Sequence, residues 1–313
     1  MRIFDNANFN FIKWRWHALI ISVVLIWAGV ASIFIRGGLP LGIDFTGGTS
    51  VILEFEPGVN ENVVRQALGP LGADAVVQRI VDSSGNQIMI RLPQTGTDAN
   101  LDEGAKRVDE ALAAANVRVV RPISKDIVGP TVGKDLQWKG IWATLTALGG
   151  ILIYVGFRFR FSFALGAIIA TFHDILITLV MLAWFNYDLS LNVIAAILTI
   201  AGYSVNDTIV VFDRVRENQR LARREPLDEI VNRAVNQTLG RTIITSGTTL
   251  LTVTALFVFG GEVLRGFAFT MLVGIITGTY STVFIAAAIA IILSRRTPSQ
   301  AAVAAQSRAK RRA

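Results

Sequence analysis

The sequence predicts a polytopic α-helical membrane protein with six transmembrane helices and an α+β, ferredoxin-like domain between the first and second helices. Its 313 residues are 52% hydrophobic and 17% charged, with a mean hydropathy of +0.51, which is too apolar for an ordinary soluble globule. Six apolar segments are each about 20 residues long, enough to cross a hydrocarbon core of about 30 Å. A polar insert, residues 36–139, separates the first two and is large enough to fold by itself.

The apolar segments set the expected organisation of the chain. We expect an N-terminal tail (1–16), a first helix (17–35), an insert with membrane-proximal linkers (36–139), helices two to six (140–294) and a basic tail (295–313). The first apolar run follows basic residues, as in a signal peptide, but its length of about 19 residues favours an uncleaved helix. The six predicted spans are His17–Ile35, Gly140–Phe157, Ser162–Trp184, Leu189–Phe212, Thr242–Gly260 and Gly266–Leu293.

Basic residues orient these spans. Lys and Arg gather in both tails and in the connections after the second and fourth spans, and such residues mark cytoplasmic loops. Both termini are therefore expected in the cytoplasm and the large insert on the outer side. We therefore interpret the net charge of +7 primarily as a consequence of membrane topology, with basic residues concentrated in cytoplasmic segments. Short basic runs without interleaved aromatic residues disfavour a nucleic-acid partner, and the lack of cysteine excludes disulfides and thiolate metal sites.

Within the insert, alternating β-branched runs and one-sided helical patterns follow one another in the order β-α-β-β-α-β. This order is typical of the split βαβ, ferredoxin-like arrangement, which serves many functions. The insert contains no histidine, and no catalytic constellation emerges from it. The expected elements are strand 50–55, helix 60–68, strand 75–81, a turn at 82–85, strand 87–92, helix 98–115 and strand 117–121.

Two glycine-containing segments flank the insert. LGIDFTGGT (41–49) contains Asp44, Gly47 and Gly48 and follows the first span; VGPTVGKDL (128–136) contains Gly129 and Pro130 and precedes the second. Glycine permits tight backbone paths. We interpret both segments as the hinge and seating of the insert on the membrane.

Asp207 lies inside an apolar segment, where an ionised aspartate costs about 2.5–3.5 kcal/mol on insertion scales, so a function is the first hypothesis. Helical phase predicts two polar stripes that face each other inside the bundle. A carboxylate near a guanidinium suits proton binding and release, but a fixed Asp207–Arg241 salt bridge or hydrogen-bonded packing is the structural alternative. The stripes are Asn192, Thr199, Tyr203, Asn206 and Asp207 on one helix, and Arg241, Thr245, Thr248, Thr249 and Thr252 on the next.

His173 and Asp174, near the middle of the third span, form a second polar spot. They would either extend a proton relay or pack as a local pair. An intramembrane aspartyl protease built on Asp174 and Asp207 is a further, weaker hypothesis. Gly274 and Gly278 permit a close helix approach. The chain has no P-loop, zinc signature or nucleophile elbow, so we expect neither a cofactor nor a metal.

Two motifs in the membrane region carry a family resemblance. GYSVNDTIVVFDRVREN (202–218) and NQTLGRTIITS (236–246) resemble the signature of SecF in the SecD/SecF protein-export family. The similarity extends through 41–49, 128–136 and His173–Asp174 to nearly the whole chain.

The resemblance implies a member of the resistance-nodulation-division superfamily in the bacterial inner membrane, with the insert in the periplasm. It implies a SecD-like subunit, the SecYEG channel and a translocating preprotein as partners, with YajC as a further candidate. The family uses the proton motive force at a late stage of translocation, and Asp207 and Arg241 match its proton path. On their own polarity within the spans, Tyr203, Asn206, His173 and Asp174 are predicted as secondary relay or packing residues. The alternative is a proton-coupled exporter of small molecules or lipids from the same superfamily.

Overall fold

The computed structural model of the chain describes residues 8–82, 85–93, 103–222 and 225–296. The chain divides into two compact units: the first comprises residues 1–39, 144–187 and 192–313, and the second 40–143 and 188–191. The centre of the turn predicted at 82–85, the start of the helix predicted at 98 and nearly all of the basic tail lie outside the described residues.

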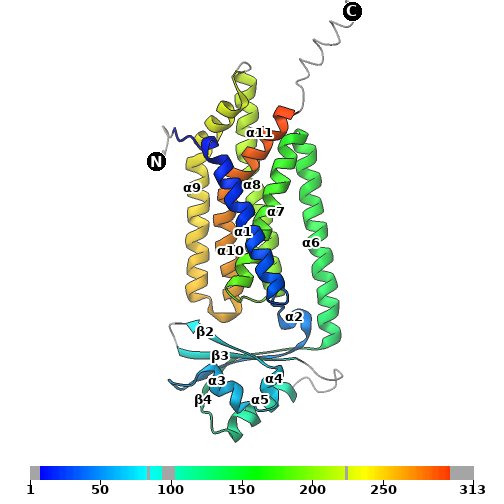
Figure 1. Ribbon diagram of the computed structural model, residues 1–313, viewed down its shortest axis with the longest axis vertical. Helices are drawn as coiled ribbons and strands as arrows, with labels where there is room; N and C mark the ends of the chain where they lie inside the picture. The colour runs from blue at the N-terminus through cyan, green and yellow to red at the C-terminus, as the bar shows by residue number, and fades with distance from the viewer. Residues whose placement is uncertain (1–7, 83–84, 94–102, 223–224, 297–313) are drawn as a thin grey trace, which may run out of the picture. The chain divides into compact units, whose positions relative to one another are not determined.

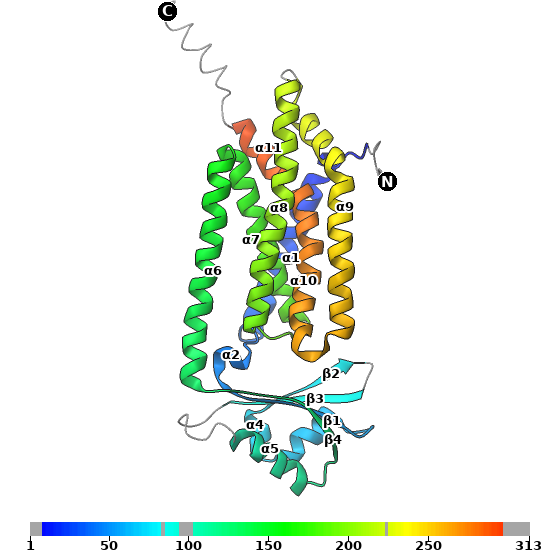
Figure 2. The same ribbon diagram turned by 180° about the vertical axis from the view of Figure 1, so that it is seen from behind.

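The first unit is a helical bundle (Figures 1 and 2). Six helical stretches of the described chain are long and apolar enough to cross a membrane, as the sequence predicted. Helix α7 packs against α1, α10 and α11, and α10 packs against α9. The helices are η1 (Ile12–Trp14), α1 (Arg15–Ile35), the end of α6 (Pro130–Arg158), α7 (Phe161–Trp184), α8 (Leu191–Leu221), α9 (Leu227–Phe259), α10 (Gly261–Ser281), η3 (Thr282–Ala286) and α11 (Ala287–Arg296).

Glycines bring helices of the bundle together. A Cβ atom on Gly274 would lie 2.2 Å from Cδ1 of Ile200, and one on Gly278 would lie 3.1 Å from Cβ of Ser204. The two glycines therefore let α10 approach α8, the role predicted for them. The sixth span is not one regular helix, because the π-helical stretch η3 separates α10 from α11.

The second unit holds a four-stranded antiparallel sheet, in the order β2-β3-β1-β4. Helices lie against one face of this sheet (Figure 1). Ala105, Val108 and Leu112 recur at helical spacing along α5 and are buried, in one cluster with the apolar residues of the strands. The elements are α2 (Ile43–Thr46), β1 (Gly48–Phe55), α3 (Glu61–Ala67), α4 (Leu71–Asp74), β2 (Val76–Asp82), β3 (Gly85–Leu92), α5 (Glu103–Ala114) and β4 (Val119–Val128).

Several elements are longer than their sequence patterns indicated. Strand β4 extends to Val128, which pairs with Gly48, whereas the prediction ended at 121. Helix α6 begins at Pro130 instead of 140, because proline is well suited to the first helical position. Helices α8 and α9 continue beyond their apolar runs to Leu221 and from Leu227, since helix formation does not require an apolar sequence.

Candidate functional site

Asp207 lies on α8 and is partly buried. Its Oδ1 accepts a hydrogen bond of 2.8 Å from the hydroxyl of Thr242 on α9. Its Oδ2 is buried and has no hydrogen-bond partner among the described residues. A buried polar atom without a partner is costly, so this oxygen is a place where a proton or another group would be stabilised.

A second polar contact joins the same two helices one turn away. The Tyr203 hydroxyl donates to Oγ of Ser246 at 3.2 Å. Oγ of Ser246 lies 2.8 Å from Oγ1 of Thr279, which brings α10 into the contact. Asp207 and Tyr203 are thus held to α9 by Thr242 and Ser246, which are spaced i, i+4 on that helix.

The two predicted stripes meet only in part: Asp207 and Tyr203 form hydrogen bonds to α9, and Arg241 interacts electrostatically with Asp207. Along α9, Arg241 is exposed, and the hydroxyls of Thr245, Thr248, Thr249 and Thr252 donate to carbonyls of their own helix. A threonine satisfied in this way needs no facing helix.

The α8 stripe is likewise only partly turned toward α9. Its members Asn192, Thr199 and Asn206 are exposed. Arg241 has no acidic oxygen within 4.0 Å in the described part of the chain, so it forms no fixed salt bridge with Asp207. In this chain without a partner, the polar faces of α8 and α9 are partly exposed.

Asp174 on α7 is fully buried and is the centre of a hydrogen-bond network. Its Oδ2 accepts hydrogen bonds from the hydroxyls of Ser204 on α8, at 2.5 Å, and Ser281 on α10, at 2.7 Å. Its Oδ1 lies 2.9 Å from Nδ1 of His173. The network ties three helices together, and among the described residues it shares no partner with Asp207. A paired-carboxylate protease site is therefore not formed.

His173 continues the network toward α1. Its ring lies 6.2 Å from that of Tyr280, whose hydroxyl donates to the carbonyl of Ala18 at 2.9 Å and lies 3.2 Å from Oγ of Ser22. Nε2 of His173 is buried without a hydrogen-bond partner in the described chain. The serines of this network had no periodic signal that would have identified them from the sequence.

In the second unit, the segment 41–49 contacts the start of α8. Oδ2 of Asp44 accepts a hydrogen bond of 2.8 Å from the backbone N–H of Leu191, the first residue of α8. Leu41 and Leu189 form a parallel bridge, supported by a hydrogen bond of 2.8 Å from the N–H of Gly42 to the carbonyl of Leu189. Asp44 therefore caps a helix that begins almost 150 residues later in the chain, satisfying one of its free N–H donors.

The two predicted hinge segments meet in this unit. Gly47 and Gly48 have φ angles of 70° and 125°, which favour glycine. A Cβ atom on Gly133, in the first turn of α6, would lie 3.0 Å from the nitrogen of Gly47. Gly129 and Pro130 connect β4 directly to α6. The glycines thus form a tightly packed joint.

Asp188, in the connection between α7 and α8, pairs with Arg91 of β3. NH1 of Arg91 also donates to Oδ1 of Asp188 at 3.2 Å. Burial raises the pKa of the Asp188 carboxyl, and the Arg91 guanidinium opposes this rise. This pair could not be predicted from a local sequence pattern, because its members are 97 residues apart.

The arrangement is better suited to proton transfer than to covalent catalysis. Within the described residues it offers a carboxylate with one oxygen that has no hydrogen-bond partner, hydroxyls that link neighbouring helices and an exposed arginine. Among the described residues, no group of three or more His, Asp or Glu side chains is placed to hold a metal ion.

Comparison with known proteins places this geometry in a family. The family described as "Protein export membrane protein SecD/SecF, C-terminal" matches residues 108–296, and the SecD/SecF GG motif matches residues 31–59. The chain is 44% identical to the protein translocase subunit SecF of Rhodothermus marinus, over 95% of this chain and 96% of that protein. It is 40% identical to SecF of Escherichia coli O157:H7, over 92% and 88% of the two chains.

A solved structure supports the relationship. The crystal structure of SecDF, a translocon-associated membrane protein from Thermus thermophilus, superimposes with a TM-score of 0.83 at 37% identity. A structure of SecDF in its super-membrane-facing form gives 0.68. Each comparison covers 95% of this chain and 40% of the SecDF chain, so the chain spans about two fifths of that longer protein. With these matches and six apolar helices, the chain is a multi-pass membrane protein that belongs to the SecD/SecF family of protein-export subunits.

Proposed function

We propose that the chain works with a SecD-like subunit to couple the proton motive force to late stages of protein translocation through the SecYEG channel. In this proposal both termini are cytoplasmic and the four-stranded unit is a periplasmic ferredoxin-like domain that acts on the preprotein. The positive-inside pattern supports this orientation, and the β-α-β-β-α-β order with the strand order β2-β3-β1-β4 supports the domain type. YajC is a further candidate partner.

The observation that carries the proposal is the buried Oδ2 of Asp207, which has no hydrogen-bond partner among the residues that the structure describes. Protonation would stabilise this oxygen, and deprotonation would favour a different arrangement of the helices around it. A proton that crosses the membrane supplies about 2.3 kcal/mol per 100 mV, enough to bias an element with two states of similar free energy. Because Arg241 is not held by Asp207 in the described chain, it is available to pair with the carboxylate in the other state.

The open polar faces support a shared proton path. Asn206 of α8 and Arg241 and Thr245 of α9 are exposed in this chain alone. Because they belong to candidate membrane spans, they would contact lipid unless another protein covered them. Polar side chains at membrane depth usually face protein or water. A SecD-like subunit that covers these faces would complete the path.

Replacing Asp207 with asparagine tests the proposal. The variant keeps the size of the side chain but cannot ionise, so gradient-driven export should fall at least tenfold, to the level measured without a gradient. Preprotein export into vesicles, with and without the gradient, together with proton flux in proteoliposomes of the complex, measures this loss.

Asp213→Asn is the matched control. It makes the same change on the same helix, at a residue that pairs with Arg158 at 2.7 Å, and should leave gradient-driven export largely intact. An Asp207→Asn complex that assembles normally and exports at the full gradient-dependent rate would refute the proposal. A small-molecule exporter would instead require transport by the purified chain alone.

A further inference from the structure

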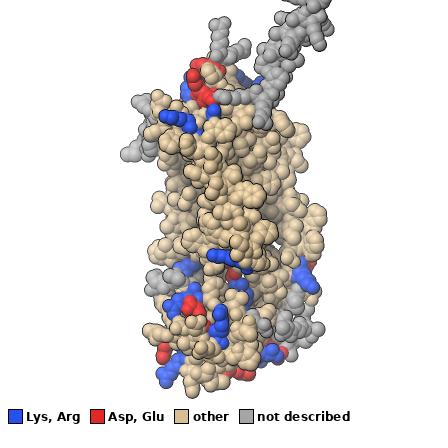
Figure 3. Space-filling view, viewed as in Figure 1, with Lys and Arg blue, Asp and Glu red and all other residues tan. Residues whose placement is uncertain are grey.

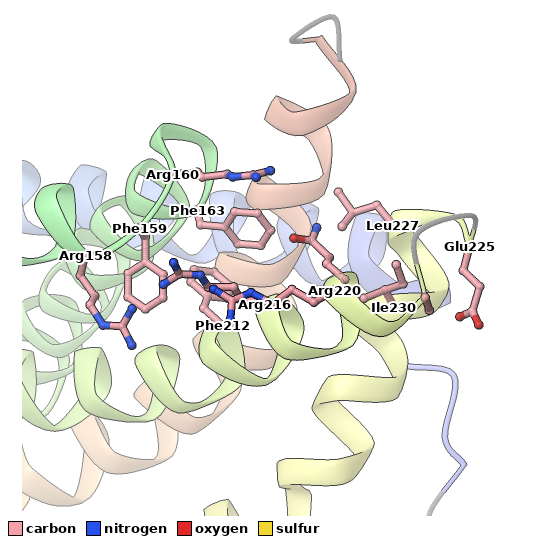
Figure 4. A pocket seen from close by; sticks show the side chains of 12 residues that line it. Arg158, Phe159, Arg160, Phe163, Phe212, Arg216, Arg220, Glu225, Leu227 and Ile230 are labelled. Atoms are coloured by element: carbon pink, nitrogen blue, oxygen red, sulfur yellow. The ribbon is translucent and has the colours of Figure 1, made fainter. Parts of the chain in front are cut away.

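A cavity of about 800 Å³ lies in the helical unit, outside the site described above. It forms where α6 ends, α7 begins, α8 ends and α9 begins (Figure 4). In Figure 3, charged residues gather at this end of the unit, whereas its flank is mostly uncharged. The cavity thus lies at the depth where apolar helices give way to charged sequence, the depth of lipid headgroups.

Three residues that share one face of α8 line one side of the cavity. Phe212, Arg216 and Arg220 follow each other at intervals of four residues and therefore share one face of α8. On the opposite side, Arg158 and Arg160 flank the short junction between α6 and α7. Four arginines from two separate parts of the chain thus line one cavity.

Most of this positive charge is not neutralised by the protein. NH2 of Arg158 is paired with Asp213, at 2.7 and 2.8 Å from the two carboxylate oxygens. The exposed side chains of Arg160, Arg216 and Arg220 have no hydrogen-bond or ion-pair partner in the described part of the chain. Guanidinium groups bind phosphate oxygens through charge-assisted hydrogen bonds, so these three side chains favour an anion between them.

The acidic residue of the lining does not compensate for this charge. Oε2 of Glu225 is 2.6 Å from NH2 of Arg233, which is not part of the lining. In Figure 4, Glu225 lies at the far side of the cavity from the arginine side chains.

The floor of the cavity is apolar. Phe212 is buried and packs edge-on against Phe159 and Phe163, with ring centroids 5.9 and 5.0 Å apart. Leu227 and Ile230 of α9 extend this surface. A cationic rim above an aromatic and aliphatic floor matches a ligand with an anionic head and apolar carbon chains.

We propose that this cavity binds the headgroup of an anionic phospholipid. Arg160, Arg216 and Arg220 would hold the phosphodiester, and the glycerol and first acyl carbons would pack on Phe163 and Phe212. Basic residues scattered along a membrane surface attract anionic lipids without a fixed site. Here three arginines without a partner among the described residues line one cavity, which favours a single lipid bound at a fixed position.

The test compares two double variants of the full-length chain. Arg216→Gln with Arg220→Gln removes two unpaired charges from the cavity. Lys13→Gln with Arg214→Gln removes two charges outside the lining, one of them on the same helix. Native mass spectrometry in mild detergent measures retention of added phosphatidylglycerol against phosphatidylcholine, and circular dichroism checks the helical content of each variant.

We expect the unaltered chain to retain one phosphatidylglycerol molecule with a preference of at least tenfold over phosphatidylcholine. The cavity variant should lose about tenfold or more of this affinity, because it lacks two of the three guanidiniums that would hold the phosphodiester. The control should retain it. Equal retention by the cavity variant and the unaltered chain, an equal loss in the control, or binding of inorganic phosphate without retention of the lipid would each overturn the proposal.

Discussion

At the scale of single residues, the state of Asp207 depends on one donor. The Thr242 hydroxyl binds Oδ1 at 2.8 Å, while the other oxygen has no partner in the described chain. Hydrogen bonds to charged groups contribute about 1.5–3 kcal/mol, twice the value for neutral pairs. Thr242 is therefore expected to set the balance between the protonated and ionised states in the proposed cycle.

Thr242→Val removes this hydroxyl and nearly keeps the volume of the side chain. We expect gradient-driven export to fall about tenfold, since 1.4 kcal/mol corresponds to a factor of ten in an equilibrium. The matched control is Thr254→Val, at a residue of the same helix outside the polar stripe, whose hydroxyl donates to the carbonyl of Leu250 at 2.7 Å; export by this variant should change by less than twofold. Equal effects of the two substitutions would show that the bond to Asp207 is not what matters.

Helical phase predicted correctly that Asp207 and Tyr203 share a face of α8, but not which residues of α9 meet them. Thr242 and Ser246 follow Arg241 and Thr245 by one position, which is a rotation of 100°. The threonine stripe was misleading because a threonine hydroxyl can bond to the preceding turn of its own helix. Polarity along a helix therefore does not by itself identify the face that contacts a neighbour.

At the scale of elements, Asp174 joins three helices through side chains. It accepts hydrogen bonds from Ser204 and Ser281 at full burial, where an unpaired hydroxyl or carboxylate is costly. Ser281 ends α10 just before the π-helical stretch η3, and the next residue, Thr282, has Oγ1 at 2.9 Å from Oγ1 of Thr208. Consecutive residues thus hold the interrupted span in place, which favours a packing role for Asp174.

Asp174→Asn provides a test between packing and proton relay. The amide oxygen can still accept both serine hydroxyls, but its hydrogen bonds are weaker than those of a carboxylate, and the NH2 group cannot accept a bond from Nδ1 of His173. The melting temperature of the purified chain should therefore fall by roughly 2–8 °C, for a loss of about 1–2 kcal/mol. Proton flux for each folded molecule should stay unchanged. A variant that melts normally but loses proton flux would instead place Asp174 in the relay.

Element order was predictable from periodicity, but element ends were not. Strand β4 reaches Val128 because its partner β1 extends to Gly48, a pairing between residues 80 positions apart that no local pattern encodes. The start of α6 at Pro130 had a local signal, because proline favours a first helical position, but the apolar run began ten residues later and dominated the prediction. Local propensity predicts where a helix or strand lies, whereas pairing with residues far away in the sequence determines where it ends.

At the scale of the whole molecule, the second unit contains two separate pieces of chain. Residues 188–191 belong with residues 40–143, and the polypeptide continues from Leu191 along α8 to Asp207. Asp44 binds the first N–H of that helix, and Arg91 pairs with Asp188 just before it. The residues that would act on a preprotein are therefore connected, through one continuous helix, to the residue that would bind the proton.

Asp44→Ala tests this connection. Loss of a helix cap costs about 1 kcal/mol, so hydrogen exchange of the Leu191 amide should accelerate about fivefold, and export should decrease. Asp44→Asn retains a side-chain oxygen that caps nearly as well and should preserve slow exchange. Unchanged exchange in the alanine variant would mean that the contact with Asp44 does not stabilise the start of α8.

The composition of the second unit also determines when it can fold during synthesis. Its last four residues follow Ala143 by more than forty positions, and two long apolar stretches, the end of α6 and all of α7, come between them. At about 5–20 residues per second, the ribosome supplies these four residues only seconds after Ala143. The unit must therefore wait for the end of α6 and for α7 to be made before Leu189 can join Leu41, so these two helical segments precede completion of the sheet-containing unit, whereas most of α8 and all of α9 to α11 follow it.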